Sequence, residues 1–351
     1  MVGTGLIGAS VGLALTAAGV DVVLRDRDPE QQKLAEAMGA GRPWSREPVE
    51  HAVLAVPPHA VAAELRALQQ ARLAATVSDV ASVKTRPVVE AVQAGCDLTS
   101  WCPAHPVAGR ERGGAVSARP DLFRDRTWVL CPLPHTSPAA EEAALALALA
   151  CGGVPVRTTP ERHDTAMATL SHVPQVVASL LAATTPTLAR DELALAGPGF
   201  RDVTRLADSD PQLWASILEG NRGPVAAAAR RLAAELGRLA EVLETAPAER
   251  AAATVHTLVA SGNTGRALLP QKAGRPALRW AWVGVVVPDR PGQLAALLAA
   301  VAGWRVNVED VSVEHSQDAP AGIVELAVAP DAADLLQERL ADAGWTAYRR
   351  S

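Results

Sequence analysis

The sequence predicts three parts: an α/β doubly wound sheet over residues 1–157, an all-helical part over 158–270, and a small α+β ferredoxin-like part over 281–351. Up to residue 157, apolar strand patterns alternate with Ala-rich helical patterns, which is typical of a parallel sheet. Strand patterns then disappear, and Ala- and Leu-rich helical periodicity replaces them. From residue 281 the order is strand, helix, strand, strand, helix, strand. The stretch 271–280, rich in Pro, Gly and charge, is the predicted linker.

The α/β part alternates strands with helices. The predicted strands are Val20–Leu24, Ala52–Val56, Thr76–Asp79 and Thr127–Cys131. The predicted helices are Leu6–Ala18, Pro29–Met38, Pro58–Gln70 and Lys84–Ala94. Only Met1 and Val2 precede the first glycine, whereas a nucleotide-binding strand normally runs about five residues before it. We therefore expect a form extended upstream by apolar residues to be more stable and more active.

A glycine-rich motif opens the first helix and predicts a dinucleotide site. Gly3–Gly8 has the pattern G-x-G-x-x-G, whose glycines allow backbone amides to approach a pyrophosphate in a Rossmann-type fold. Asp26 follows the next strand, where a carboxylate bonds the ribose 2′-hydroxyl of NAD. Its neighbours Arg25 and Arg27 leave NADP open. The residues expected to contact the cofactor are Gly3, Gly5, Leu6, Ile7, Gly8, Asp26, Val56 and Pro57. The Val56-Pro57 segment also fits a simple strand-to-helix turn.

Two polar residues of the α/β part are candidates for chemistry. Ser82 lies in Asp79–Lys84, where a strand gives way to a helix, so it suits either a helix cap or contact with the nicotinamide and substrate. His105 stands between two prolines in a predicted loop at the sheet edge. A lone histidine is more often structural, but here it follows a dinucleotide motif, and it can accept a proton while hydride leaves the same carbon.

The helical part offers further polar candidates. The predicted helices are Asp164–Thr184, Gln212–Leu243 and Ala248–Thr264. His163 and His172 are nine residues apart, about two and a half turns, so a straight helix does not place both on one face, and Pro174 is expected to bend it. Arg201 and Arg205, four residues apart, can point together and bind a carboxylate, although a solvated charged turn is equally compatible.

Composition excludes several classes of function. The formal net charge is −5, which gives no basic surface for nucleic acid. The four cysteines form no C-x-x-C pair and no His lies beside them at ligand spacing, so we expect free thiols in a reducing cytoplasm and no metal site. No apolar run of about 18 residues and no cleavable signal are evident, so no membrane span is expected.

Together, these motifs resemble the prephenate/arogenate dehydrogenase family over residues 1 to about 270. The matching pieces are Gly3–Ser10, Asp79–Lys84, His105–Gly109, Leu122–Pro132, His163-Asp164, Ser171–Pro174 and Gly199–Arg205. The resemblance implies NAD-dependent oxidative decarboxylation of prephenate to 4-hydroxyphenylpyruvate, or of arogenate to L-tyrosine, by a cytoplasmic homodimer. It implies that His105 polarises the 4-hydroxyl, that Ser82 supports it, and that Arg205, helped by Arg201, binds a substrate carboxylate. His172 and Gln175 are also expected at the substrate, although Gln175 stands where many members have histidine, which leaves prephenate or arogenate open.

The C-terminal part resembles an ACT domain. Val287–Leu294 matches its first strand-to-helix turn, and Asn307–Asp310 matches the start of its second strand. Its predicted strands are Trp282–Val287, Val306–Glu314, Ile323–Val328 and Trp345–Arg349, and its helices Gln293–Ala302 and Ala332–Ala343. The resemblance implies an amino-acid effector near Gly292 and Asn307, with L-tyrosine expected ahead of phenylalanine or tryptophan. A purely structural module is the alternative.

Two other functions are alternatives to the dehydrogenase that this resemblance implies. A 3-hydroxyacid dehydrogenase would rely on a lysine in the helical part, yet no lysine occurs between Lys84 and Lys272. A non-catalytic amino-acid-binding regulator would not need Asp26, Ser82, His105 and Arg205 together.

Overall fold

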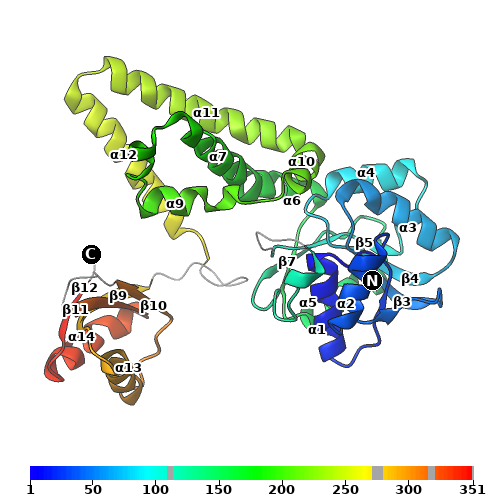
Figure 1. The fold of residues 1–351 in the computed structure, drawn as a ribbon, viewed down its shortest axis with the longest axis horizontal. Helices are drawn as coiled ribbons and strands as arrows, with labels where there is room; N and C mark the ends of the chain where they lie inside the picture. The colour runs from blue at the N-terminus through cyan, green and yellow to red at the C-terminus, as the bar shows by residue number, and fades with distance from the viewer. Residues whose placement is uncertain (109–113, 271–279, 315–320, 350–351) are drawn as a thin grey trace. The chain divides into compact units, whose positions relative to one another are not determined.

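The computed structural model describes residues 1–108, 114–270, 280–314 and 321–349. They form two compact units, one built from Met1–Leu258 and one that contains the C-terminal sheet, and helix α12 (Ala248–Ala267) runs across the division (Figure 1). The linker expected at 271–280 lies almost entirely outside the described residues, as does most of the charged loop after His105.

The first unit begins with the α/β part. Its helices are α1 (Leu6–Ala17), α2 (Pro29–Ala37), α3 (Val61–Gln70), α4 (Thr85–Gln93) and α5 (Pro138–Ala150), with short 3₁₀ turns η1 (Pro58–Ala60) and η2 (Ala115–Ser117). Its strands are β1 (Val23–Leu24), β2 (Arg42–Pro43), β3 (Val49–Leu54), β4 (Ala74–Asp79), β5 (Trp101–Cys102), β6 (Ala104–Pro106), β7 (Thr127–Leu130) and β8 (Val154–Arg157). The sequence-based assignment did not include β2, β5, β6, β8 or α5.

Parallel pairing dominates this sheet. Strand β3 pairs with β4, β4 with β5, and β7 with β8, all parallel. The central position is taken by Val2, which forms parallel bridges to both Arg25 and Leu54. Val2 donates its N–H to Val53 and accepts from Ala55, so one residue joins the two halves. The exception to parallel pairing is β6, which runs antiparallel to β7.

The core of the α/β part is closed by its own helices. Trp101, Trp128 and Phe123 are fully buried, and Phe123 packs edge-on against Trp128. Ala- and Gly-rich helix faces allow close contact with the sheet. At Gly12 in α1, an added Cβ would lie 2.4 Å from the Ala40 carbonyl oxygen. This close packing holds α1 against the segment between α2 and β2.

The helical part of the first unit begins with α6 (Pro160–Met167). A π-helical turn, η3 (Ala168–His172), continues into α7 (Val173–Ala182). Then come η4 (Thr185–Thr187), α8 (Arg190–Leu193), α9 (Pro198–Thr204), η5 (Arg205–Ala207), α10 (Pro211–Gly220) and α11 (Arg222–Thr245). The single helix predicted over Gln212–Leu243 is therefore wrong, because Asn221 leaves the helical conformation and separates α10 from α11.

The π-helical turn corrects the expected placement of the two histidines. Pro174 has no N–H to donate to the carbonyl four residues before it, and the helix adopts the wider turn immediately upstream. One inserted residue makes nine positions act as about eight, or roughly 2.2 turns. His163 and His172 thus lie nearer to one face than a straight helix allows.

Helix 160–187 is long and apolar enough to satisfy a length-and-hydropathy test for a membrane span, a feature that the sequence-based search had not identified. It carries the buried polar residues His163, Asp164, His172 and Gln175. These side chains bond to neighbouring elements of the same unit.

The second unit holds a four-stranded antiparallel sheet in the order β10-β11-β9-β12. Its elements are β9 (Ala281–Pro288), α13 (Gln293–Gly303), β10 (Asp310–Glu314), β11 (Ala321–Val328), η6 (Pro330–Ala332), α14 (Ala333–Asp342) and β12 (Thr346–Arg349). Valines of β9 and leucines of α13 and α14 form its core, including Val285, Leu297 and Leu336. Strand β10 is shorter than the predicted Val306–Glu314.

Candidate active site

The glycine-rich loop has the shape that a pyrophosphate needs. Gly3 has φ +93°, and a Cβ there would lie 2.2 Å from the Ala55 carbonyl oxygen. At Gly8 a Cβ would lie 2.0 Å from the Gly3 oxygen, so these two glycines are fixed by packing. Gly5 is different: no atom lies within 4 Å of its ideal Cβ, and it is the N-cap of α1 with no side-chain cap. Open space at an uncapped helix N-terminus fits a bound phosphate group.

Asp26 lies beside this loop. Its Oδ2 accepts hydrogen bonds from the backbone N–H of Thr4 at 2.5 Å and from the Thr4 hydroxyl at 2.9 Å. Its own backbone N–H donates to Gln32. The carboxylate is therefore held against the turn that would receive the pyrophosphate, where a ribose follows in a dinucleotide. Leu6 and Ile7 begin α1 at the same place, and Val56 contacts the Gly3 position while Pro57 is exposed.

His105 lies in a strand, which corrects the expected loop. It belongs to β6 and pairs with Val129 of β7. The two flanking prolines suggested a loop, but a three-residue strand with Pro106 at its end accommodates them. The His105 side chain is buried. Burial lowers the pKa of His105 well below its ordinary value, and His163, Lys84 and His172 lower it further, so the ring is neutral near pH 7.

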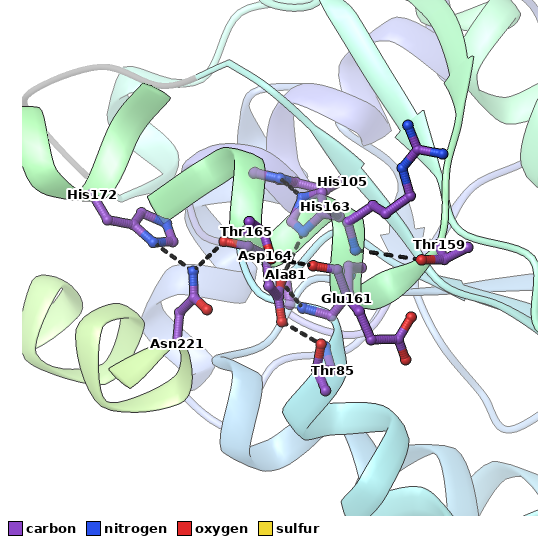
Figure 2. Close-up of polar contacts among 12 residues, drawn as sticks. Ala81, Thr85, His105, Thr159, Glu161, His163, Asp164, Thr165, His172 and Asn221 are labelled. Atoms are coloured by element: carbon purple, nitrogen blue, oxygen red, sulfur yellow. Dashed lines mark hydrogen bonds and ion pairs between the residues drawn. The ribbon is translucent and has the colours of Figure 1, made fainter. Parts of the chain in front are cut away.

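A hydrogen-bonded chain links His105 to the helical part (Figure 2). His105 Nδ1 lies 2.8 Å from His163 Nε2, and the two rings meet edge to face. His163 Nδ1 lies 2.8 Å from Asp164 Oδ1. Strand β6 and helix α6 thus place three side chains in line, all of them buried.

Asp164 also caps helix α4. Its Oδ1 accepts from the backbone N–H of Lys84 at 2.9 Å, and its Oδ2 accepts from that of Thr85 at 2.8 Å. Burial alone would raise the pKa of Asp164, but hydrogen bonds from His163 and Thr85 outweigh it and lower that pKa. The carboxylate is therefore ionised. Ser82 does not cap α4, because the helix begins at Thr85. Ser82 lies half-buried in the preceding loop.

Beneath His105 lies a buried ion pair that sequence reasoning missed. Lys84 Nζ donates to Asp79 Oδ1 and, at 2.6 Å, to the carbonyl oxygen of Ala104. Both charged side chains are fully buried. Trp101 Nε1 donates to the other oxygen of Asp79. Because a buried lysine is stable only with such partners, the pair fixes the backbone directly before His105.

His172 is held by Asn221, a residue that sequence reasoning also missed. Asn221 Nδ2 donates to the backbone carbonyl oxygen of Asp164 at 2.7 Å and lies 3.0 Å from His172 Nδ1. Burial lowers the pKa of His172 to about 4, which outweighs the opposite effect of Asp164. Among the described residues, Asn221 Oδ1 has no hydrogen-bond partner. The only sequence signal was an asparagine within a helical pattern.

The structure does not place Arg201 and Arg205 in this cluster. Arg201 is exposed on α9 and donates to the Ala196 carbonyl oxygen, and Arg205 is exposed at the start of η5. Gln175 is buried and donates to the carbonyl oxygen of Leu206 at 2.8 Å, so it fixes the segment that carries Arg205. In the second unit, Gly292 has φ +87° at the N-cap of α13, and Asn307 is exposed and bonds to Glu309.

No group of three or more His, Cys, Asp or Glu side chains suited to a metal occurs in the described part of the chain. The glycine loop can bind a dinucleotide, and the neutral, fixed imidazole of His105 can act as a proton acceptor. These are the requirements for removing a hydride from an alcohol carbon and the proton from its hydroxyl group.

Comparison with known proteins identifies two family domains. Residues 11–157 match "prephenate dehydrogenase, nucleotide-binding domain" and residues 159–257 match "prephenate dehydrogenase, dimerization domain". The chain is 36% identical over 349 residues to a probable prephenate dehydrogenase, NovF, of Streptomyces niveus, with 96% of each chain covered. It is 28% identical to the prephenate dehydrogenase of Bacillus subtilis (strain 168), covering 73% of this chain and 68% of the relative.

A solved structure gives a similar result. The crystal structure of prephenate dehydrogenase from A. aeolicus with hydroxyphenyl propionate and NAD+ has a TM-score of 0.67 and 25% identity. The match covers 76% of this chain and 95% of that one. Synechocystis arogenate dehydrogenase shares the fold, with a TM-score of 0.63 and 24% identity over 76% of this chain and 97% of that one.

Proposed function

This chain belongs to the prephenate dehydrogenase family, and from that premise we propose that it carries out the NAD-dependent oxidative decarboxylation of prephenate to 4-hydroxyphenylpyruvate. The observation that carries the assignment to this site is the neutral His105 on β6, hydrogen-bonded through His163 to Asp164. A buried imidazole that uses one ring nitrogen in such a hydrogen bond has its other ring nitrogen available to bond a substrate hydroxyl.

The reaction requires a proton acceptor and side chains that bind the charged groups of the substrate. NAD held at the glycine loop by Gly3–Gly8 and Asp26 would supply the acceptor for the hydride of the carbon that bears the 4-hydroxyl. His105 accepts the hydroxyl proton as the C–H bond breaks and returns it to the oxygen once carbon dioxide has left and the ring is aromatic. Aromatisation supplies much of the driving force, so the protein mainly positions and polarises the substrate. Ser82, three residues before α4, is proposed to support this contact.

The cofactor fits the glycine loop. Gly5 leaves space at the start of α1, and Asp26 is placed for the ribose hydroxyls. A 2′-phosphate would approach the Asp26 carboxylate, which favours NAD over NADP. Leu6, Ile7, Val56 and Pro57 are proposed to border the same site.

The substrate carries two carboxylates, and basic side chains must receive them. We assign Arg205 to one carboxylate, with Arg201 nearby, because a guanidinium binds a carboxylate through two parallel hydrogen bonds. His172 and Gln175 are proposed on the substrate side of the helical part. Gln175 holds Leu206, the neighbour of Arg205, which connects these two assignments.

The test is a four-way assay with the purified full chain. Prephenate and arogenate are each offered with NAD and with NADP, and formation of the reduced cofactor is followed. We expect the highest kcat/KM for prephenate with NAD. A higher kcat/KM for arogenate would make the chain an arogenate dehydrogenase, and no turnover with either substrate would overturn the proposed function.

The assembly is proposed to be a cytoplasmic homodimer formed through the helical part. Its match to a dimerization domain supports this, as do the many exposed apolar side chains of α11 and α12. Partners of other kinds, such as nucleic acid or a membrane, are not part of the proposal.

The second unit is proposed to be an ACT domain that senses an amino acid, with L-tyrosine as the first candidate. Supporting features are the order of its elements, the strand order β10-β11-β9-β12, and the left-handed Gly292 at the start of α13. We place the effector near Gly292 and Asn307. Titrating each aromatic amino acid into the full chain and measuring turnover tests this, and an unchanged rate with all three would leave the unit a structural module.

A further inference from the structure

We propose that Asp164 fixes opposite tautomers on two histidines of the active site: Nδ1–H on His105 through its carboxylate, and Nε2–H on His172 through its backbone carbonyl. His163, Asp164 and Asn221 are then positioning residues, since none of them needs to touch substrate. The tautomers follow from the hydrogen bonds once His163 and His172 are taken as neutral imidazoles, whereas their catalytic consequence rests on the proposed function.

The first step of the argument is that Asp164 can only accept. Its Oδ1 and Oδ2 already receive the backbone N–H groups of Lys84 and Thr85, at 2.9 and 2.8 Å. Those donors are fixed at the start of a helix, where the positive end of the helix dipole also favours a carboxylate. The ring nitrogen that faces Oδ1, His163 Nδ1 at 2.8 Å, must therefore carry a proton.

The second step carries this direction to His105. A neutral His163 protonated at Nδ1 has an unprotonated Nε2, which can only accept. The atom 2.8 Å away is His105 Nδ1, so that nitrogen is the donor. The remaining nitrogen of His105, Nε2, then keeps its lone pair. No described residue hydrogen-bonds to it, which leaves it for the proton of a substrate hydroxyl.

The third step concerns His172, where the direction is reversed. The Asp164 backbone oxygen accepts, so the Asn221 atom at 2.7 Å must be its amide nitrogen. Turning the amide over would bring two oxygens together. The same nitrogen lies 3.0 Å from His172 Nδ1, and Figure 2 shows this contact as a dashed line. That ring nitrogen is therefore an acceptor, and His172 carries its proton on Nε2.

The two tautomers differ in their intrinsic cost. In water an imidazole prefers the Nε2–H form, so His172 is held in its ordinary state. His105 is held in the less common one. When His105 accepts the substrate proton it becomes an imidazolium whose Nδ1–H still points at His163, and the Asp164 charge lies one ring further on. This arrangement orients the base and stabilises its charged form without any new contact.

The direct test is ¹⁵N NMR of the full chain labelled at histidine, without substrate. The eight histidines are assigned by replacing them one at a time. Protonated and unprotonated ring nitrogens differ widely in ¹⁵N shift, so each tautomer is observed directly. We expect Nδ1–H at His105 and Nε2–H at His172 at pH 7. Nε2–H at His105, or a doubly protonated His163, would overturn the proposal.

Two replacements of His163 separate orientation from simple packing. In His163→Gln the amide oxygen can occupy the place of Nε2 and still accept from His105. In His163→Asn the amide can occupy the place of Nδ1 and bond Asp164, but it leaves His105 without an acceptor. We expect Gln to keep the Nδ1–H tautomer with kcat within about tenfold of the parent, and Asn to lose both, with kcat lowered about 10²-fold. KM should change little in either.

A matched control is His51, a histidine of the α/β part held between Thr76 and Ser78. His51→Asn should lower the melting temperature yet leave the signals of His105 and His172, and kcat, unchanged. If kcat follows melting temperature across all variants, or if Gln and Asn at position 163 behave alike, the role of His163 is structural and the proposal fails. Correct tautomers in a chain that does not turn over prephenate would instead refute the proposed function alone.

Discussion

The α/β part and the helical part of the first unit treat their apolar side chains in opposite ways. In the α/β part, helix α5 buries Ala140, Ala144, Leu147 and Ala148, and it packs beside the buried residues of β5 and β7. In the helical part, the 24 residues of α11 bury only Ala228, and none of the described residues of α12 is buried. The leucines left exposed on these two helices include Leu232, Leu236, Leu243 and Leu258.

The difference shows which region is complete by itself. A sheet covered by its own helices removes apolar surface from water within one chain. Long helices with exposed leucines leave apolar surface in contact with water. Burial of that surface against another surface would stabilise the helical part. The active site lies where the two regions meet, because His105 comes from β6 and its partners His163 and Asp164 come from α6. Catalysis therefore depends on residues from both regions.

The largest effect is expected at the meeting point itself. Replacing His105 by Asn removes the proton acceptor while leaving the glycine loop untouched, so kcat should fall by about 10²-fold or more. NAD affinity, measured by fluorescence titration, should remain as in the parent. A fall of only about twofold would make His105 structural and move the chemistry away from this boundary.

The next effect measures what the helical part contributes to binding. Arg205→Ala leaves a substrate carboxylate without its partner, a loss of roughly 1.5–3 kcal/mol, so KM for prephenate should rise between about tenfold and 10²-fold. Steady-state kinetics with saturating NAD give this value. Arg119→Ala in the α/β part, an exposed arginine paired with Asp121, is the control and should leave KM unchanged. An unaltered KM in Arg205→Ala would remove this residue from the site.

A pair of leucine replacements tests the two surfaces against each other. Leu236 on α11 and Leu149 on α5 are both more than half exposed, at 66% and 56%. Leu236→Asp should shift the chain from dimer to monomer in sedimentation velocity, because it places a charge in the paired surface. Leu149→Asp should leave the dimer intact, since exposed substitutions change stability by only about 0.5 kcal/mol. Equal behaviour of the two variants would contradict the contrast between the regions.

The last effect, on stability and not on catalysis, is a dependence of the free energy of unfolding on pH. Burial lowers the pKa of His51 in the α/β part and of His172 in the helical part, each to about 4. In the unfolded chain, each of these histidines has a pKa of about 6.5. Between these values the unfolded state holds more protons, so stability is complete above pH 6.5 and falls as the pH drops toward 4. Each histidine contributes a slope of up to about 1.4 kcal/mol per pH unit.

Denaturant unfolding between pH 4 and 6.5 measures that slope. If the two regions unfold as one, His51→Asn and His172→Asn each reduce the slope of a single transition. Two transitions, each altered by only one variant, would show that the regions are separately stable. A slope unaffected by either variant would mean that other groups govern the acid side.

Much of the α/β part could be predicted from the sequence, because its signals are local. The helix predicted after the glycine motif begins at Leu6 as observed and ends one residue beyond α1, and apolar runs indicated strands that overlap β3 and β4. Strands β5 and β6 have two and three residues, too few to show a periodicity. The sequence therefore predicted a loop at His105, where the structure has strand β6, and the catalytic role of His105 remains a prediction.

The site could be predicted only as a set of candidates. The bond from Lys84 to Asp164 joins residues 80 positions apart, and the buried pair of Asp79 and Lys84 depends on the sheet around it. Asn221 carried no pattern that distinguishes a helix break from a helical position. The π-helical turn before Pro174 changed the phase between His163 and His172, which a fixed period of 3.6 cannot anticipate.

The capping of α4 has a consequence for how the chain is made. The helix begins at Thr85 with no side-chain cap of its own, and its carboxylate cap is supplied by Asp164, 79 residues later in the chain. Domains generally fold in order as they leave the ribosome. Here the strands and the glycine loop emerge first, but the backbone N–H groups of Lys84 and Thr85 have no carboxylate acceptor until α6 has been synthesised. The nucleotide half of the enzyme thus becomes complete only when the next part of the chain arrives.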